Sequence, residues 1–124
     1  MKEQPQCKVD GWGDKRWSLN GKKHREDGPA VEWEDGSKEW WLKGRRHRED
    51  GPAVEHRNGG KSWWLKGRRH REDGPAIELD DGTKSWWLHG EQVHPETLVD
   101  LHLSRGTFCY YNEQTETLHF DENK

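Results

Sequence analysis

A seven-residue motif occurs three times in this sequence, each copy 23 residues after the last. The letters HREDGPA occupy positions 24–30, 47–53 and 70–76. The triplet Trp-Trp-Leu recurs with the same step, at 40–42, 63–65 and 86–88. A period of this length is typical of repeat proteins, in which each unit packs only against its neighbours. The repeat therefore predicts an elongated molecule with a narrow core.

The repeat divides the chain into three parts. A degenerate unit at 1–23 keeps Trp17 in phase with the later copies, but its first ten residues do not match them. Relaxed terminal units typically cap repeat arrays. We therefore expect an N-terminal capping half-repeat at 1–23, three full repeats at 24–92 and a C-terminal cap at 93–124.

Each full unit has the sequence pattern of a β-hairpin. In the first one, 29–34 is short and contains β-formers, Asp35-Gly36 is a strong turn signal, and 37–43 supplies the return strand. The units contain too much Gly and Pro for a helix. The fold class that follows is mainly β: an elongated antiparallel β-meander of tandem 23-residue hairpin repeats.

Two registers of this hairpin remain open. With a two-residue turn, alternation along the strands gives one packed face made of Val31, Trp33, Trp40 and Leu42. A three-residue turn with a bulge would instead place Glu32 opposite Lys38.

The last part of the chain predicts a small α/β cap. Pro95 suits the first turn of a helix over 95–103, which Gly106 would end. The segments 107–111 and 117–120 alternate as a final hairpin would. Such a cap would cover the open sheet edge, where exposed strands risk aggregation.

Composition narrows the range of partners and locations. Apolar residues make up only 27% of the chain and charged residues 36%, so the nine Trp must supply much of the buried area. A net charge of −3 does not favour nucleic acid or an anionic membrane. The polar start lacks a signal peptide, and no apolar run approaches a membrane span. We expect a cytoplasmic protein with reduced thiols at Cys109 and at Cys7, the latter in a tail.

An aromatic strand followed by Gly-x-x-His recurs at 17–24, 40–47 and 63–70. This pattern and the 23-residue period resemble the MORN repeat over roughly residues 11–92. The usual MORN unit has Gly directly after the His, whereas this chain has Arg-Glu-Asp-Gly-Pro-Ala, so the unit is a variant. Repeats of the HREDGPA type resemble those of bacteriophage proteins and bacterial antitoxin-like proteins. The resemblance implies a binding scaffold, and more narrowly a small phage-type inhibitor of a bacterial defence component such as a CRISPR effector, acting in the host cytoplasm.

The second Trp of each unit is a candidate binding residue. The degenerate unit at 1–23 has Ser18 at this position. Trp41, Trp64 and Trp87 are therefore more dispensable to folding than Trp17 and its copies. They could form an exposed aromatic ladder, since Trp is enriched at binding hot spots. The alternative is that they pack under the stems of long Lys and Arg side chains.

Arginines recur beside these tryptophans and would form a stripe along one sheet edge. The stripe could bind an acidic protein surface, or it could bind phosphates and bases. The alternative is solvated charge paired with adjacent Glu and Asp. The candidate residues are Arg45, Arg46, Arg48, Arg68, Arg69 and Arg71.

The HREDGPA loops also contain groups that could bind a metal or transfer protons. However, stacked copies would spread His47, Glu49 and Asp50 along a row about 10 Å apart, whereas zinc needs ligands that converge. A structural role is favoured, with His packed on Trp and Asp capping the turn amides. A weaker zinc hint lies in His94, His102 and His119 near Cys109. We expect no catalytic residue, metal or cofactor.

These patterns give an ordered set of functional hypotheses. The first is a non-enzymatic module that binds a protein partner. The alternative is a nucleic-acid or nucleotide binder that uses the arginines and tryptophans. A third is an antitoxin-like or lipid-binding MORN scaffold. No membrane partner is expected, and the open sheet edge could also support a homodimer.

Overall fold

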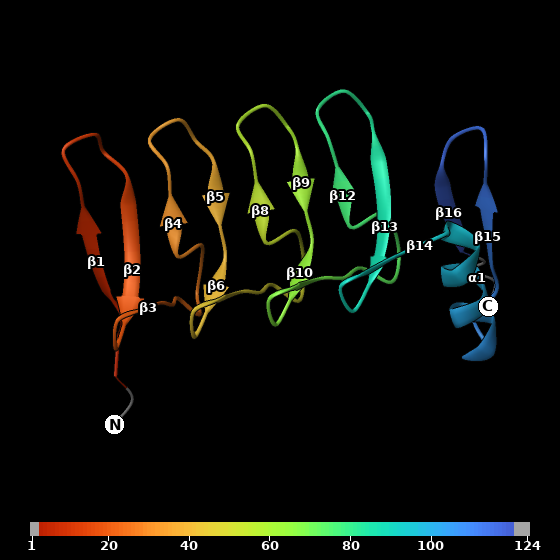
Figure 1. Cartoon of the computed structure of the whole chain (residues 1–124), viewed down its shortest axis with the longest axis horizontal. Helices are drawn as coiled ribbons and strands as arrows, with labels where there is room; N and C mark the ends of the chain where they lie inside the picture. Colours follow the sequence, from red (N-terminus) through yellow and green to blue (C-terminus); the bar gives the residue numbers. More distant parts are fainter. Residues whose placement is uncertain (1–2, 121–124) are drawn as a thin grey trace.

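The computed structural model describes residues 3–120 as a row of hairpins along one axis (Figure 1). The N-terminus lies at one end of the row, and a short helix with a last hairpin lies at the other. The principal sheet has the order β1-β2-β4-β5-β8-β9-β12-β13-β14, with neighbouring strands antiparallel. The predicted mainly β meander of hairpin repeats is therefore confirmed.

The N-terminal unit forms a complete hairpin. Its strands are β1 (Gln6–Val9), β2 (Lys15–Leu19) and the short β3 (Lys22–Lys23). Cys7 pairs with Trp17, so the prediction that Cys7 lies in a tail was wrong. Every residue of β1 is exposed, and β1 forms the first edge of the principal sheet.

Each repeat contributes one strand pair to the principal sheet and then a second, shorter hairpin (Figure 1). In the third repeat the return strand runs unbroken into the shorter hairpin. The strands are β4 (Val31–Glu32), β5 (Lys38–Glu39), β6 (Trp41–Leu42), β7 (Arg45–Arg46), β8 (Val54–Glu55), β9 (Lys61–Ser62), β10 (Trp64–Leu65), β11 (Arg68–Arg69), β12 (Ile77–Glu78), β13 (Lys84–Leu88) and β14 (Glu91–Val93).

The hairpin register is the one with a three-residue turn. Glu32 lies opposite Lys38, and the Trp33 amide donates to the Ser37 carbonyl over 2.8 Å. Gly36 closes the turn at φ +99°, a conformation that favours glycine. This register places Trp33 and Glu39 on the same face, where the Trp33 indole donates to the Glu39 carboxylate.

The packed face expected from a two-residue turn is therefore not formed. Trp41 lies on the same side as Val31 and Trp33, and its indole also donates to Glu39. Trp40 projects to the opposite side of the sheet, because side chains alternate along a strand. Its backbone amide donates to the carbonyl of Ala53 in the next repeat over 2.7 Å, as that of Trp17 does to Ala30.

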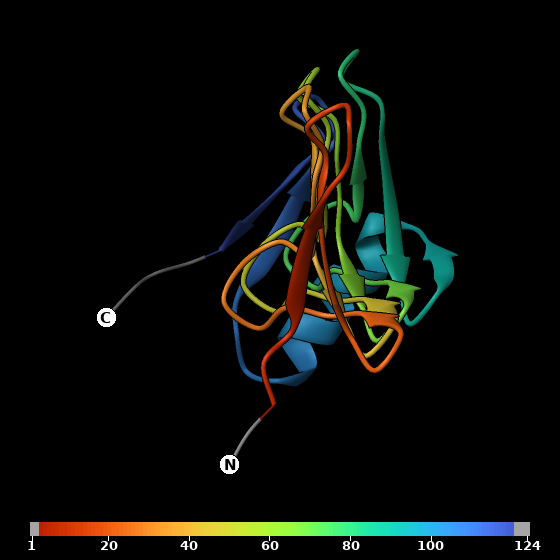
Figure 2. The same ribbon diagram turned by 90° about the vertical axis from the view of Figure 1, so that its left-hand side faces the viewer.

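The core is a thin line through the repeats. Ala30, Ala53 and Ala76 are fully buried, as is Val31, and Val54 is 7% exposed. Small residues at these positions let neighbouring units approach closely. Viewed along the axis, the hairpins superimpose, with the connecting loops and the shorter hairpins extending to opposite sides (Figure 2).

The C-terminal cap consists of α1 (Pro95–Ser104), β15 (Cys109–Asn112) and β16 (Thr117–Phe120). The His94 side chain caps α1 by accepting the Glu96 amide over 3.1 Å. Leu98 is fully buried and Cys109 is 2% exposed, so the helix and hairpin share a small core. The predicted helix-plus-hairpin cap is confirmed. Within residues 3–120, α1 is too short to cross a membrane.

Candidate binding surface

The arginine of each HREDGPA loop is built into the fold. The Arg48 guanidinium stacks 3.8 Å from the Trp40 ring centroid, and its Nε donates to Asp50 over 3.2 Å. Its Nη1 donates to the Pro52 carbonyl and to Glu55, over 3.0 and 3.1 Å. Equivalent contacts surround Arg25 and Arg71. These arginines hold the loop, the Trp and the next strand together.

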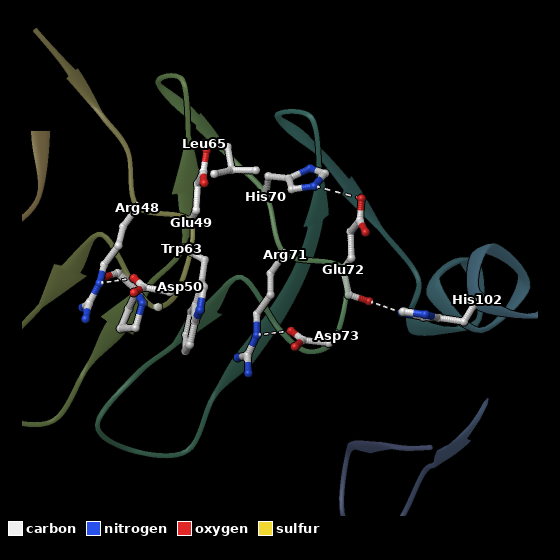
Figure 3. A pocket seen from close by; sticks show the side chains of 12 residues that line it. Arg48, Glu49, Asp50, Trp63, Leu65, His70, Arg71, Glu72, Asp73 and His102 are labelled. Atoms are coloured by element: carbon white, nitrogen blue, oxygen red, sulfur yellow. Dashed lines mark hydrogen bonds and ion pairs between the residues drawn. The ribbon is translucent and has the colours of Figure 1, made fainter. Parts of the chain in front are cut away.

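The glycine of the loop makes room for this arginine. A Cβ atom on Gly51 would lie 2.9 Å from the Arg48 Cζ atom, closer than real Cβ contacts. The guanidinium is therefore held between the Trp40 ring and the glycine backbone. Figure 3 shows the equivalent arrangement of Trp63, Arg71 and Asp73.

The loop histidines join the start of each repeat to its shorter hairpin. His47 Nδ1 accepts the Lys66 amide over 2.9 Å, and Lys66 has a left-handed φ of +51°. His47 Nε2 lies 3.5 Å from the Glu49 carboxylate, which fits a neutral ring with its proton on Nε2. The histidine thus caps the turn of the shorter hairpin in its own repeat, while Asp50 binds Arg48 instead of the turn amides we expected.

Two grooves lie between successive loops, with volumes of about 740 and 640 Å³. In the larger one, Arg71 bonds to Asp73 and His70 Nε2 lies 3.4 Å from Glu72 (Figure 3). Burial, followed by repulsion from His89, lowers the pKa of His70. Among residues 3–120 no three His, Cys, Asp or Glu side chains are grouped to hold a metal. The groove residues are thus engaged with one another.

The second Trp series lies among cations from neighbouring strands. Arg46 Cζ lies 5.1 Å from the ring centroids of both Trp41 and Trp64. Arg69 Cζ lies 5.1 Å from Trp64 and 4.9 Å from Trp87. Lys23 Nζ, 4.5 Å from Trp41, begins the series. We call this alternating row the Trp–cation ladder: Lys23, Trp41, Arg46, Trp64, Arg69 and Trp87.

Hydrogen bonds to nearby side chains fix the orientation of the ladder indoles. Each indole N–H donates to the side chain two residues earlier in the chain: Trp41 to Glu39, Trp64 to Ser62 and Trp87 to Ser85, over 2.8 to 2.9 Å. The three rings are half-buried. Because the rings are already oriented, binding a partner costs little conformational entropy at these side chains.

The cations of the ladder have no counter-ion in the described structure. Across residues 3–120 the ion pairs of Arg and Lys join Arg16, Arg25, Arg48, Arg71 and Arg105 to carboxylates, and none reaches the ladder. The Nε atoms of Arg46 and Arg69 are buried without a hydrogen-bond partner. The ladder cations are therefore not paired with a carboxylate of the described residues.

The structure divides the predicted binding residues into three groups. Trp41, Trp64, Trp87, Arg46 and Arg69 come together in the ladder. Arg45 and Arg68 project from the other side of β7 and β11, where their stems cover Gly67 and Gly90 of the next unit. Arg48 and Arg71 lie in the loops. Lys23, which the 23-residue period places in phase with Arg46, also belongs to the ladder.

The cap histidines do not form the zinc cluster considered from the sequence. His102 Nε2 lies 2.7 Å from the Glu72 carbonyl, and His119 Nε2 lies 2.8 Å from Thr117 Oγ1. His94 caps α1. Each ring is thus engaged at a separate place, and Cys109 and Cys7 are both free thiols.

Comparisons with protein-family models, curated proteins and solved structures find no match for this chain. The MORN-like resemblance therefore stays a prediction. The Trp–cation ladder can attract an anionic group by charge and hold it by guanidinium hydrogen bonds.

Proposed function

We propose that the protein is a non-enzymatic repeat module that binds an acidic protein surface through the Trp–cation ladder. One observation carries the proposal: Arg46 and Arg69 are held rigidly between indoles and have no carboxylate partner within residues 3–120. Isolated surface charges are usually worth little, because flexible side chains must be ordered to use them. Here the folding of the repeats has already ordered them.

A pull-down from bacterial lysate tests this proposal. Wild-type protein is compared with R46E/R69E, and with K8E/R57E, which makes the same change in net charge at exposed positions outside the ladder. We expect proteins retained by the wild type and the control to be lost from R46E/R69E. Retention of the same proteins by R46E/R69E, or no retention by the wild type, would overturn the proposal. Near-ultraviolet circular dichroism confirms that each variant is folded.

Nucleic acid is the alternative partner, and the ladder geometry weighs against it. Proteins that bind single-stranded nucleic acid stack its bases on open aromatic faces. The Trp64 ring has Arg46 and Arg69 over it at 5.1 Å each, so its faces are occupied. The sequence pI of about 6.2 is also far below the values typical of nucleic-acid-binding domains. A salt-sensitive mobility shift with RNA or DNA that R46E/R69E abolishes would favour this alternative.

The resemblance to phage repeat proteins supports a narrower form of the proposal. The partner would then be a bacterial defence component such as a CRISPR effector, met in the cytoplasm of the host. An effector assay with purified protein tests it: the wild type should inhibit, and R46E/R69E should not. Absence of inhibition across a panel of such effectors would leave only the broader proposal of an acidic protein partner.

The open edge of β1 supports a homodimer as a second, independent interaction. The Asp10 amide donates to the Asp14 carbonyl over 3.0 Å, so the alternation of an antiparallel ladder turns the amides of Cys7 and Val9 outward. A second copy could pair there across a two-fold axis. Sedimentation should show a dimer that V9P converts to a monomer, and a wild-type monomer at high concentration would refute this.

A further inference from the structure

The ladder presents its cations at a regular interval. Successive repeats are displaced by two strands of the principal sheet, since β4 and β5 precede β8 and β9. Two strand spacings of about 4.8 Å give a repeat of about 10 Å. Arg46 and Arg69, which contact the same Trp64 ring, follow each other at this interval, and Lys23 precedes them by one repeat.

Only the outer parts of these cations are available to a partner. The Nε atoms of Arg46 and Arg69 are buried, and their guanidinium carbons lie between indoles. The terminal Nη groups remain, with donors suited to a carboxylate. The complementary surface is thus a row of three carboxylates about 10 Å apart, one for each cation.

An α-helix can present carboxylates with this spacing. Seven residues of helix rise about 10.5 Å, because each residue rises about 1.5 Å. Side chains seven residues apart also stay on one face, drifting by only about 20° per heptad. Acidic residues at i, i+7 and i+14 therefore match the ladder in both distance and direction.

A nucleic-acid backbone fits this interval less well. Duplex DNA carries one charge about every 1.7 Å of its axis, so most phosphates would meet no cation of the ladder. The chain also has an overall charge of −3, which opposes a dense polyanion. A helix with three carboxylates matches the interval and carries far fewer negative charges than the duplex.

We infer that the Trp–cation ladder is a receptor for an acidic α-helix with carboxylates at heptad spacing. This inference rests on the proposed function and narrows its partner to one kind of surface. One helix face lies along the row, with its carboxylates over Lys23, Arg46 and Arg69. The rings of Trp41 and Trp64 each have two of the chain's own cations over them, and Trp87 has one, so the helix binds through the cations.

Two synthetic peptides of identical composition test the spacing. Both are helical, with an alanine–glutamine background and three glutamates, placed at i, i+7 and i+14 in one and at i, i+5 and i+10 in the other. The second arrangement spreads the glutamates around the helix, since each residue turns by about 100°. Binding is followed in full-length protein by NMR, through the indole N–H signals of Trp41, Trp64 and Trp87.

We expect the heptad peptide to bind at least tenfold more tightly than its control, and R46Q/R69Q to remove the preference. Lys8→Gln with Arg57→Gln serves as the matched protein control and should keep it. Equal affinity for the two peptides, or no binding of either, would overturn the inference. The two peptides could bind equally while the pull-down still depends on Arg46 and Arg69. In that case the proposed function stands, and only the inference of a helical partner is wrong.

Discussion

Arg46 and Arg48 are two positions apart and have different roles. Arg48 uses its Nε and Nη1 atoms on Asp50, Pro52 and Glu55, so its charge is satisfied within the fold. The Arg46 guanidinium lies between two indoles and forms no ion pair with a carboxylate of the described residues. The same residue type therefore supports the loop at one position and forms the binding surface at the other.

Gly51→Ala should destabilise the protein by about 1–3 kcal/mol, the usual cost of overpacking. The new methyl group would meet the Arg48 guanidinium at 2.9 Å. Urea unfolding measures the effect, and a double-mutant cycle with R48A isolates its cause. In the R48A background the glycine substitution should cost much less. Equal costs in the two backgrounds would show that the guanidinium is not the obstacle.

Acid should weaken the contact between the His70 loop and the shorter hairpin of the third repeat. Burial lowers the pKa of His70 below its usual value near 6.5, so the unfolded chain binds the proton more readily. The contribution of this group to stability is present above about pH 6.5 and is lost as the pH falls through the folded-state pKa. Its neutral Nδ1 atom accepts the His89 amide over 2.9 Å.

Urea midpoints at pH 7.5 and 5.0 test this pH dependence. His70→Asn is the control, because its amide oxygen can accept the same amide but does not titrate. The wild-type midpoint should fall more between the two pH values than the H70N midpoint. Parallel losses in the two proteins would assign the pH dependence to other groups.

The strands of the principal sheet are linked by a row of alternating charges. Lys15, Glu32, Lys38, Glu55, Lys61, Glu78 and Lys84 lie directly opposite one another across seven successive strands. Opposite charges at such positions contribute roughly 0.2–1 kcal/mol each. The row helps to fix the register of strands that are only two residues long.

Lys38→Glu should destabilise the sheet by about 1 kcal/mol, because it sets a carboxylate between Glu32 and Glu55. Lys43→Glu makes the same charge change at an exposed turn outside the row and should cost less. Added salt should narrow the difference in urea midpoint between the variants, since it screens surface charges. If K43E lowers the urea midpoint as much as K38E does, the row of opposite charges does not explain the loss of stability.

The sequence predicts the strands and turns better than it predicts which side chains share a face of the sheet. Asp35-Gly36 marks a turn, but the dipeptide fits both hairpin registers, and only packing between repeats selects the pairing of Glu32 with Lys38. The bond of the Trp40 amide to Ala53 joins two units, and local sequence does not encode it. The strand β1 was missed because its residues do not match the repeat.

At the scale of the whole molecule, repetition turns one weak contact into a regular surface. The 23-residue period predicted which Trp and Arg residues recur. It did not separate Arg46 from Arg48, because that distinction depends on strand alternation and on the return of the loop toward Trp40. Stacking of the units then aligns Lys23, Arg46 and Arg69 in one row.

The most direct test of the account is side-chain NMR of the protein labelled with ¹⁵N-arginine, titrated with the heptad-spaced acidic peptide. In the free protein, the Nε–H signals of Arg46 and Arg69 should be shifted by the neighbouring indole rings and exchange slowly with water, because these atoms are buried. On titration these two signals should move, while those of Arg48 and Arg71 stay in place. Movement confined to Arg48 and Arg71, or no movement at all, would contradict the claim that the Trp–cation ladder is the binding surface.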